Sequence, residues 1–423
     1  MKKLISLLSL CICVFSAKGQ ITLEYCQQQA RANYPLIKQY NLIEQSKEYT
    51  FAQIHKAYLP QLSLQGKAGW QSDVTKFPDE FSDKIEQMMG AEISFPSQDQ
   101  YSIALELSQI IWDGGMISSQ KKAINSQNEI EKQSLEVNLY ALRKQVDQLF
   151  FAILLIDEQL LQIELLQKEL DRNYNLILSY IDGGLAQQSD QDEIRVEILS
   201  VEQRKTEMNT SRKAYINMLS AFIGKEIGAT TFIKPSSEFS TSSTINRPEL
   251  KMFDSQIKLF ETQNSTLWNK GMPKIALFAR GAYANPGLNM FKSGFTPYFM
   301  GGVQLAWNFG GLYSNKDEQR FFETQKQKVE VQREVFLFNT QQEITQKNSE
   351  IEKLQSLLKN DDEIIRLRES IQKTSEFKVE NGALSVSDLM RDIHAANMAR
   401  QTKSFHEIQL LHNIWEIKQL KMD

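Results

Sequence analysis

The second half of this 423-residue chain repeats the first half in the same order. Three pairs of similar segments lie roughly 200 residues apart, the spacing expected of a large internal repeat. The pairs are 59–70 with 272–283, 110–115 with 306–311, and 182–190 with 380–388. We interpret the chain as a tandem duplication. Its predicted parts are a signal peptide over 1–19, a first structural repeat over 20–229, a connection over 230–247 and a second repeat over 248–423.

The placement of proline permits very long helices in each repeat. All nine prolines lie outside 97–234 and 298–423, and a proline inside a helix costs about 3 kcal/mol. Apolar residues step by four and three along 135–163, which is the heptad pattern of a coiled coil. We therefore predict long helices over about 116–181 and 312–380. Each should turn at a glycine-bearing segment into a second, antiparallel helix.

Two shorter segments in each repeat have the alternation of β-strands. Apolar and polar residues alternate over 62–70 and 298–309, and more weakly over 101–111 and 275–283. A tilted strand of about ten residues crosses a bilayer. Four strands cannot close a barrel, and an open sheet edge cannot face lipid. Three copies of the chain would supply twelve strands, an even number within the range of bacterial barrels.

The start of the chain has the pattern of a secretory signal peptide. Lys2 and Lys3 precede an apolar stretch, and small residues two apart, Ala17 and Gly19, predict cleavage before Gln20. No cysteine in this segment follows a small residue, which argues against lipidation. Removal of the signal lowers the formal net charge from −4 to −7. An acidic protein of this kind is a poor candidate for binding nucleic acid.

The order of these elements, with glycine-bearing turns between strand and helix and at the hairpin tips, resembles the TolC family of outer-membrane efflux proteins. The resemblance covers essentially the whole mature chain. It implies a mainly α fold with a β-barrel contribution, in which a homotrimer forms a 12-stranded barrel in outer-membrane lipid and a periplasmic α-barrel. It also implies a Gram-negative bacterium, a periplasmic adaptor (a membrane fusion protein) and an inner-membrane RND, ABC or MFS exporter. The expected function is the passive exit duct of a tripartite efflux pump or type I secretion system.

The resemblance gives roles to two groups of turns. Strand-to-helix turns are expected at Asp113, Gly114, Gly115, Phe309, Gly310 and Gly311. The hairpin tips are expected to dock the adaptor and close the duct, and their matching positions are Gly183, Gly184, Leu185, Ser189, Asn381, Gly382, Ala383, Leu384 and Ser387.

Three charged residues beside the tips are candidates for the periplasmic gate or entrance: Asp190, Asp388 and Arg391. Three copies of Asp388 could ring the entrance and favour cations. The alternative is that both aspartates are helix-start residues, stabilised by the helix dipole. A contact between Arg391 and Asp388, three residues apart on a helix, could cancel much of the field.

The sequence carries no recognisable enzyme motif. His406 and Glu407 begin like a zinc-protease motif, but Leu410 stands where the second histidine is required. No phosphate-binding loop, nucleophile elbow, cofactor site or metal-ligand spacing is found. The main alternative to a duct is a periplasmic coiled-coil scaffold or adaptor without a pore, which would not need paired ten-residue strands before each long hairpin.

Overall fold

The chain forms two compact units in a computed structural model. The described residues are 20–422, except 79–80, 83, 85–86, 89, 91–94, 185, 229–230, 237–243, 291 and 293. The expected signal peptide, Leu185 and part of the expected connection therefore lie outside the described residues. Unit 1 contains 1–39, 134–251 and 334–423, and unit 2 contains 40–133 and 252–333. Each unit takes segments from both sequence repeats.

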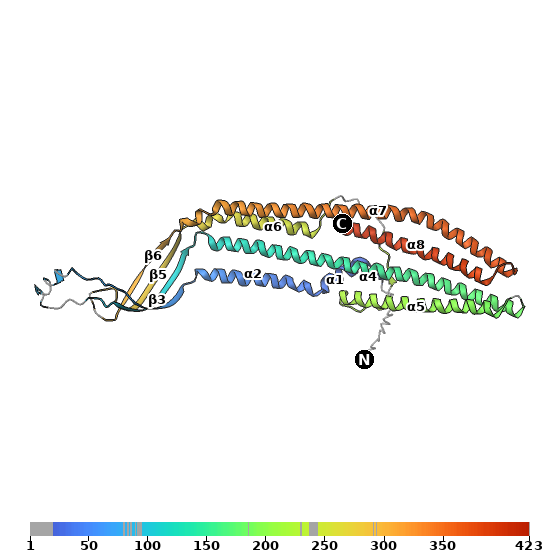
Figure 1. Ribbon diagram of the computed structural model, residues 1–423, viewed down its shortest axis with the longest axis horizontal. Coiled ribbons are helices and arrows are strands. Elements are labelled where there is room, and N and C mark those ends of the chain that lie inside the picture. Colours follow the sequence, from blue (N-terminus) through green and yellow to red (C-terminus); the bar gives the residue numbers. More distant parts are fainter. Residues whose placement is uncertain are drawn as a thin grey trace, which may run out of the picture. The chain divides into compact units, whose positions relative to one another are not determined.

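Two helical hairpins supply most of unit 1. The long helices α4 (Met116–Asp182) and α7 (Asn315–Glu380) have 67 and 66 residues, and the returning helices α5 (Gln188–Ile223) and α8 (Val386–Lys421) have 36 each. Each returning helix runs back beside its long helix (Figure 1). The matching lengths confirm the predicted tandem-duplicated hairpins. Helix α7 begins three residues later than predicted, because the 3₁₀ helix η4 (Phe309–Leu312) precedes it.

The predicted heptad seam is the core of unit 1. Near the tips, buried aliphatic residues of α4, α5 and α8 form one cluster with Val379 of α7. Farther along, residues of α4 from Leu142 to Leu154 pack with α5, Ile408 of α8 and the N-terminal helix α1 (Leu23–Asn33). Helix α1 buries Leu23, Cys26 and Ala30 on one face, the spacing of a helical stripe. Burial of these seams accounts for why such long helices are stable.

Short elements complete unit 1. Strands β1 (Gln20–Ile21) and β4 (Thr231–Phe232) pair in parallel, which joins the first described residues to the segment that follows α5. The 3₁₀ helix η1 (Pro35–Lys38) follows α1. Helix α6 (Pro248–Ser265) starts at the end of a unit 1 segment and continues into unit 2, and it begins with proline at its first position, where no backbone donor is needed.

Unit 2 is built around a four-stranded antiparallel sheet, seen beside the β3, β5 and β6 labels of Figure 1. Its strands are β2 (Gln61–Trp70), β3 (Asp99–Trp112), β5 (Lys274–Asn285) and β6 (Thr296–Ala306), in that spatial order. The four predicted strands are thus present. Helix α2 (Gln39–His55) and the 3₁₀ helices η2 (Lys56–Tyr58) and η3 (Leu267–Gly271) flank it in the sequence. No described helix is long and apolar enough to span a bilayer.

Candidate functional site: an open sheet and two hairpin tips

One face of the sheet is apolar and exposed. Residues paired directly across neighbouring strands share a face, and the register aligns Leu64 with Leu105, and Leu277 with Val303. Large apolar side chains on this face remain in contact with solvent in the single chain: Leu64 is 72% exposed and Ile103 is 61% exposed. A contiguous exposed apolar surface of this kind marks contact with lipid or with another protein.

The opposite face is the more polar one, and we call it the polar face. It carries Ser63, Gln65 and Glu106 among other polar residues. Its small residues are buried, with Ala104 only 1% exposed, although the neighbouring Ile103 on the other face is largely exposed. An exposed apolar face and a more polar face are the two faces expected of strands that belong to a barrel with a polar interior.

Both edges of the sheet are open in the single chain. Strand β2 pairs only with β3, and strand β6 pairs only with β5, within the described residues. Each edge strand leaves a row of backbone N–H and C=O groups without a partner, which would cost several kcal/mol per group in lipid. The sheet is complete only when further strands cover these edges.

A β-bulge changes the alternation at the helix end of β3. Ile110 pairs with Ala276, but Trp112 pairs with Ile275, so Ile111 is an extra residue. The bulge brings Trp112 to the apolar face, on the same side as Leu305. Strict alternation would have placed this tryptophan in the polar interior.

Aromatic residues lie at both ends of the apolar face. At the loop end, Tyr283 and Phe295 stack with ring centroids 5.3 Å apart, and Tyr101 lies 6.4 Å from Phe295. At the helix end, Trp307 and Phe309 are 4.6 Å apart, and the Trp307 indole donates to the carbonyl of Gly271 at 2.9 Å. Paired aromatic belts of this kind anchor barrels at the two membrane interfaces.

The first strand-to-helix turn is held by the buried carboxylate of Asp113. One carboxylate oxygen accepts the N–H of Gly115 at 2.9 Å and the hydroxyl of Tyr58 at 3.1 Å, and the other accepts the N–H of Ile117 at 2.5 Å. Burial alone would raise the pKa of Asp113, but these donors hold it below its usual value. Gly114 has φ +70°, and a Cβ there would lie 2.7 Å from the side chain of Met272.

The second strand-to-helix turn has a different geometry. The Asn308 side chain accepts the N–H of Gly310 at 2.9 Å, and Phe309–Leu312 continue as the 3₁₀ helix η4. Neither Gly310 nor Gly311 has the positive φ found in the first turn. Corresponding glycines in the two repeats therefore make their turns in two ways.

The hairpin tips are exposed turns built on glycine. Gly184 and Gly382 have φ of +74° and +68°, the left-handed conformation that favours glycine at the end of a helix. In the second tip, the N–H of Ala383 donates to the carbonyl of Lys378 at 2.8 Å. Gly183, Gly184, Ser189, Asn381, Gly382, Ala383 and Ser387 are exposed, whereas Leu384 packs against the core of the hairpins.

The tip aspartates are engaged in local contacts at the starts of helices. Asp190 accepts the N–H of Gln187 at 2.8 Å, which caps α5. Asp388 accepts the hydroxyl of Ser385 at 2.7 Å and forms an ion pair with Arg391 at 3.0 Å. The contact expected from the spacing of Arg391 and Asp388 is thus present.

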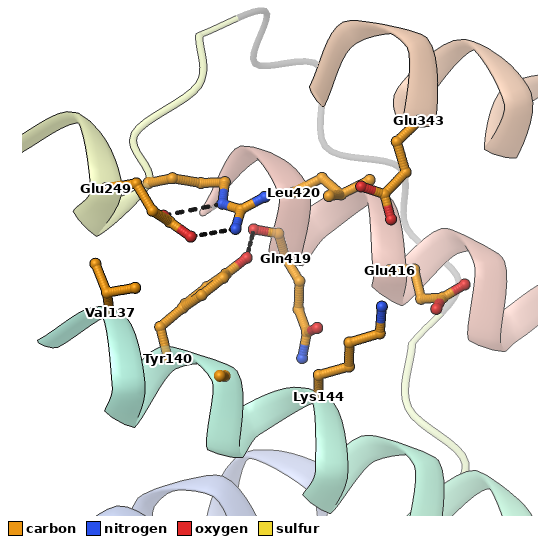
Figure 2. Close-up of a pocket in the computed structure, with 10 residues that line it drawn as sticks. Val137, Tyr140, Lys144, Glu249, Glu343, Glu416, Gln419 and Leu420 are labelled. Carbon is orange, nitrogen blue, oxygen red and sulfur yellow. Dashed lines mark hydrogen bonds and ion pairs between the residues drawn. The ribbon is translucent and has the colours of Figure 1, made fainter. Parts of the chain in front are cut away.

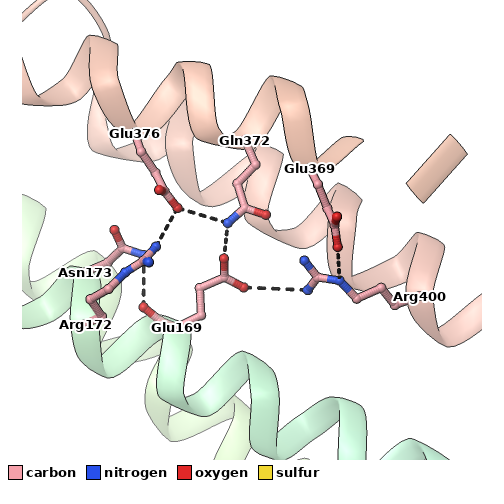
Figure 3. A network of polar contacts seen from close by, with 7 residues as sticks. All are labelled: Glu169, Arg172, Asn173, Glu369, Gln372, Glu376 and Arg400. Atoms are coloured by element: carbon pink, nitrogen blue, oxygen red, sulfur yellow. Dashed lines mark hydrogen bonds and ion pairs between the residues drawn. The ribbon is translucent and has the colours of Figure 1, made fainter. Parts of the chain in front are cut away.

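A polar network joins the two hairpins above the tips (Figure 3). Glu169 of α4 accepts a hydrogen bond from Gln372 of α7 and lies 3.8 Å from Arg400 of α8. Gln372 also donates to Glu376 at 3.0 Å, and Arg172 of α4 donates to the same carboxylate at 2.7 Å. Because Gln372 is buried, breaking the network would leave polar groups without partners at a cost of about 1–3 kcal/mol each. The network therefore fixes how the hairpins of one copy pack together.

The connection between the repeats is anchored by Arg247. Its guanidinium lies between the rings of Tyr140 and Phe336, 5.1 and 4.8 Å from their centroids, and donates to Glu249. Tyr140 donates in turn to the backbone carbonyl of Gln419. Tyr140, Arg247, Glu249 and Gln419 line a cavity of about 220 Å³. Figure 2 shows Lys144 and Glu343 beside the same cavity. The arrangement holds the connection against α4, α7 and α8.

A second buried carboxyl, Asp147 of α4, joins three helices. Its two oxygens accept amide hydrogens from Gln27 of α1, at 2.6 Å, and from Gln419 of α8. It is 3% exposed and forms no ion pair within the described part of the chain. Burial raises the pKa of Asp147 to about 7, although Gln27 and the positive charge of Arg143 oppose the rise. Sequence reasoning did not single out this residue.

The structure brings together no set of catalytic groups within the residues it describes. His406 pairs with Asp361 at 2.6 Å across the α7–α8 hairpin, which makes it a packing contact between helices. No group of three or more His, Cys, Asp or Glu among the described residues is arranged to hold a metal ion. The described residues instead form a sheet with an exposed apolar face and a more polar opposite face, and two exposed hairpin tips. Together these features fit a membrane channel protein whose strands would form part of a β-barrel.

Comparison with known proteins gives the same class. Residues 26–225 match the family model described as outer membrane efflux protein. No match was found among curated protein sequences.

Solved structures resemble the chain over nearly its whole length. CusC, described as forming a transmembrane channel, is 14% identical with a TM-score of 0.66, and the match covers 94% of this chain and 91% of CusC. The outer membrane protein VceC of Vibrio cholerae is 14% identical with a TM-score of 0.62, covering 94% and 96%. The outer membrane channel CmeC of Campylobacter jejuni is 13% identical with a TM-score of 0.62, covering 94% and 85%. The chain thus has the fold of outer-membrane channels, and its residues 26–225 match the outer membrane efflux protein model.

The buried carboxyl of Asp147 leads to a prediction about pH. The pKa of Asp147 in the folded protein, about 7, lies above its ordinary value of 3.8. Between about pH 4 and pH 7 the carboxyl is therefore protonated in the folded state and ionised in the unfolded state. This contribution to stability is complete below about pH 4 and is lost as the pH rises to about 7, by at most about 1.4 kcal/mol per pH unit. We expect the unfolding temperature of wild type, relative to that of Asp147→Asn, to fall across this range.

The measurement is thermal unfolding of the detergent-extracted protein at several pH values. Asp171→Asn removes an exposed carboxyl from the same helix and should change the profile little. Parallel profiles for wild type and Asp147→Asn would contradict the account of this site.

Proposed function

We propose that the chain is the passive exit duct of a tripartite efflux pump or type I secretion system. Three copies would place their sheets edge to edge in a 12-stranded barrel, with the helical hairpins forming a periplasmic tube. A periplasmic adaptor would dock on the tips, and an inner-membrane RND, ABC or MFS exporter would supply the energy and choose the cargo. In this proposal the chain itself catalyses nothing.

The observation that carries the proposal is the open-edged, two-faced sheet. An apolar outer face, a polar inner face and two unpaired edges fit a barrel completed by other copies. Two copies would give a barrel of eight strands, and side chains would fill the interior of such a barrel. Three copies give a lumen and a closed cyclic assembly. A coiled-coil scaffold would leave the exposed apolar face of the sheet without a role.

To act as an exit duct, the chain must itself be secreted from the cytoplasm and reach the outer membrane. Cleavage of the signal peptide before Gln20, without lipidation, would leave a mature N-terminus that pairs with the connection through β1 and β4. We also propose that the first repeat ends between 229 and 230 and that the second repeat begins between 247 and 248. The first would fall after the α4–α5 hairpin, and the second would fall at the start of α6.

The tips are proposed to dock the adaptor and to form the periplasmic entrance. Their exposed residues lie at the ends of the hairpins, where a partner can bind without disturbing the core. Leu185, outside the described residues, is proposed to belong to the same docking surface. Asp388, Asp190 and Arg391 would lie at the entrance of the duct. Because Arg391 pairs with each Asp388, we propose that the ring of Asp388 is largely neutral in the wild-type trimer.

The tip charges can be tested by blocking the channel with a trivalent cation in planar bilayers. Arg391→Ala removes the partner of Asp388, so its ring should attract the cation and deepen the block. Adding Asp388→Ala to Arg391→Ala should abolish this gain. Equal block in wild type and both variants would rule out a role for Asp388 at the entrance.

The proposed function is tested by the mass and the single-channel conductance of one detergent-extracted preparation. We expect a trimer with small, flickering conductance, because the tips restrict the periplasmic end. A monomer or dimer without conductance would show that the strands do not close a barrel, and would favour the scaffold.

A further inference from the structure

The polar face of the sheet carries an unusual balance of charge. Strand register places Lys67, Lys274 and Arg280 on this face together with a single carboxylate, Glu106. The other acidic residue of the four strands, Asp99, pairs with Trp70 and belongs to the apolar-face rows, at the loop end. The whole chain has a net charge of −4. The positive balance of this face is therefore opposite in sign to that of the protein as a whole.

The three cations of this face form no ion pairs in the described part of the chain. Among the described residues, none of Lys67, Lys274 and Arg280 has an ion-pair partner, although Arg280 lies directly opposite Glu106 in the register. The Nε atom of Arg280 is buried without a hydrogen-bond partner. Basic side chains that lack internal partners keep their charge available to ions or ligands beside the sheet.

The three cations occupy different levels along the strands. Arg280 is six residues from Lys274 on β5, a separation of about 20 Å at 3.3 Å per residue. Lys67 belongs to the row of Ser102 and Ala284, which lies about 13 Å beyond Arg280 in the same direction. In a barrel of three copies, each level would become a ring of three positive charges around the lumen.

We propose that the barrel lumen of this channel selects anions, and that its cargo is a negatively charged small molecule or polymer bearing carboxylate, phosphate or sulfonate groups. The inference rests on the proposed trimeric duct. Rings of Lys and Arg favour anions in pores because the surrounding low-dielectric wall focuses their field. Arg280 contributes planar donors suited to these oxyanions, and Lys67 and Lys274 contribute point charges at either side. The balanced Asp388–Arg391 pairs at the tips would not oppose the passage of anions.

The experiment is the reversal potential of the trimer in planar bilayers under a potassium chloride gradient. Wild type should be more permeable to chloride than to potassium. Lys67→Gln/Lys274→Gln/Arg280→Gln should lower the ratio of chloride to potassium permeability several-fold, and Glu106→Gln should raise it. Lys359→Gln, an exposed lysine on α7 outside the strands, is a matched loss of positive charge and should change the ratio much less.

The outcomes separate this inference from the proposed function. A conducting trimer with cation selectivity, or one whose selectivity is unchanged in both the triple variant and Glu106→Gln, would overturn anion selection and leave the duct intact. Absence of conductance in every variant, wild type included, would overturn the duct and the inference with it. If the triple variant does not assemble, Glu106→Gln still decides the inference, because it changes the same lumen in the opposite direction.

Discussion

The hydrogen-bonding groups at the edges of the sheet are the constraint on which the rest of this structure depends. In water, β2 and β6 could bind solvent, but in a bilayer their outer N–H and C=O groups require protein partners. The exposed apolar face fits contact with lipid, and the two open edges require further strands there. One chain supplies only four strands. The requirement for pairing therefore makes assembly part of the fold.

The helical hairpins follow from a second constraint, the burial of long apolar seams. Residues at heptad spacing on α4 pack against α5. Helix α8 and Val379 of α7 pack against the same core. Polar groups placed within this packing set its geometry. Glu169, Gln372 and Arg400 join the hairpins near the tips, and Arg247 holds the connection between the repeats. Such contacts specify one arrangement because unpaired buried groups are costly.

Much of the fold could be predicted from the sequence because its signals are local and repeated. Alternation identified the four strands, and proline-free heptads identified the long helices, with α4 beginning at the predicted Met116. The Arg391–Asp388 contact followed from helical spacing. The expected docking and gating roles of the tips stay predictions, as do the repeat boundaries.

Features that depend on distant partners were missed. The bulge at Ile111 is specified by pairing with β5, and it reverses the face that alternation assigns to Trp112. Asp147 is buried because Gln27 and Gln419 reach it from two other helices. Asp361, Gln372 and Ser375 of α7 are polar residues that the structure shows to be buried. In the sequence they appear only as polar residues within the long proline-free helix. Their partners on α4 and α8 could not be read from that pattern.

Hydrogen–deuterium exchange of the edge strands, in protein extracted from membranes, tests the central claim most directly. If copies complete the sheet, amides in β2 and β6 should be protected as strongly as those in β3 and β5, which are paired within one chain. Fast exchange in the edge strands beside slow exchange in the two central strands would mean that the edges are open. That result would contradict a barrel closed by several copies of this chain.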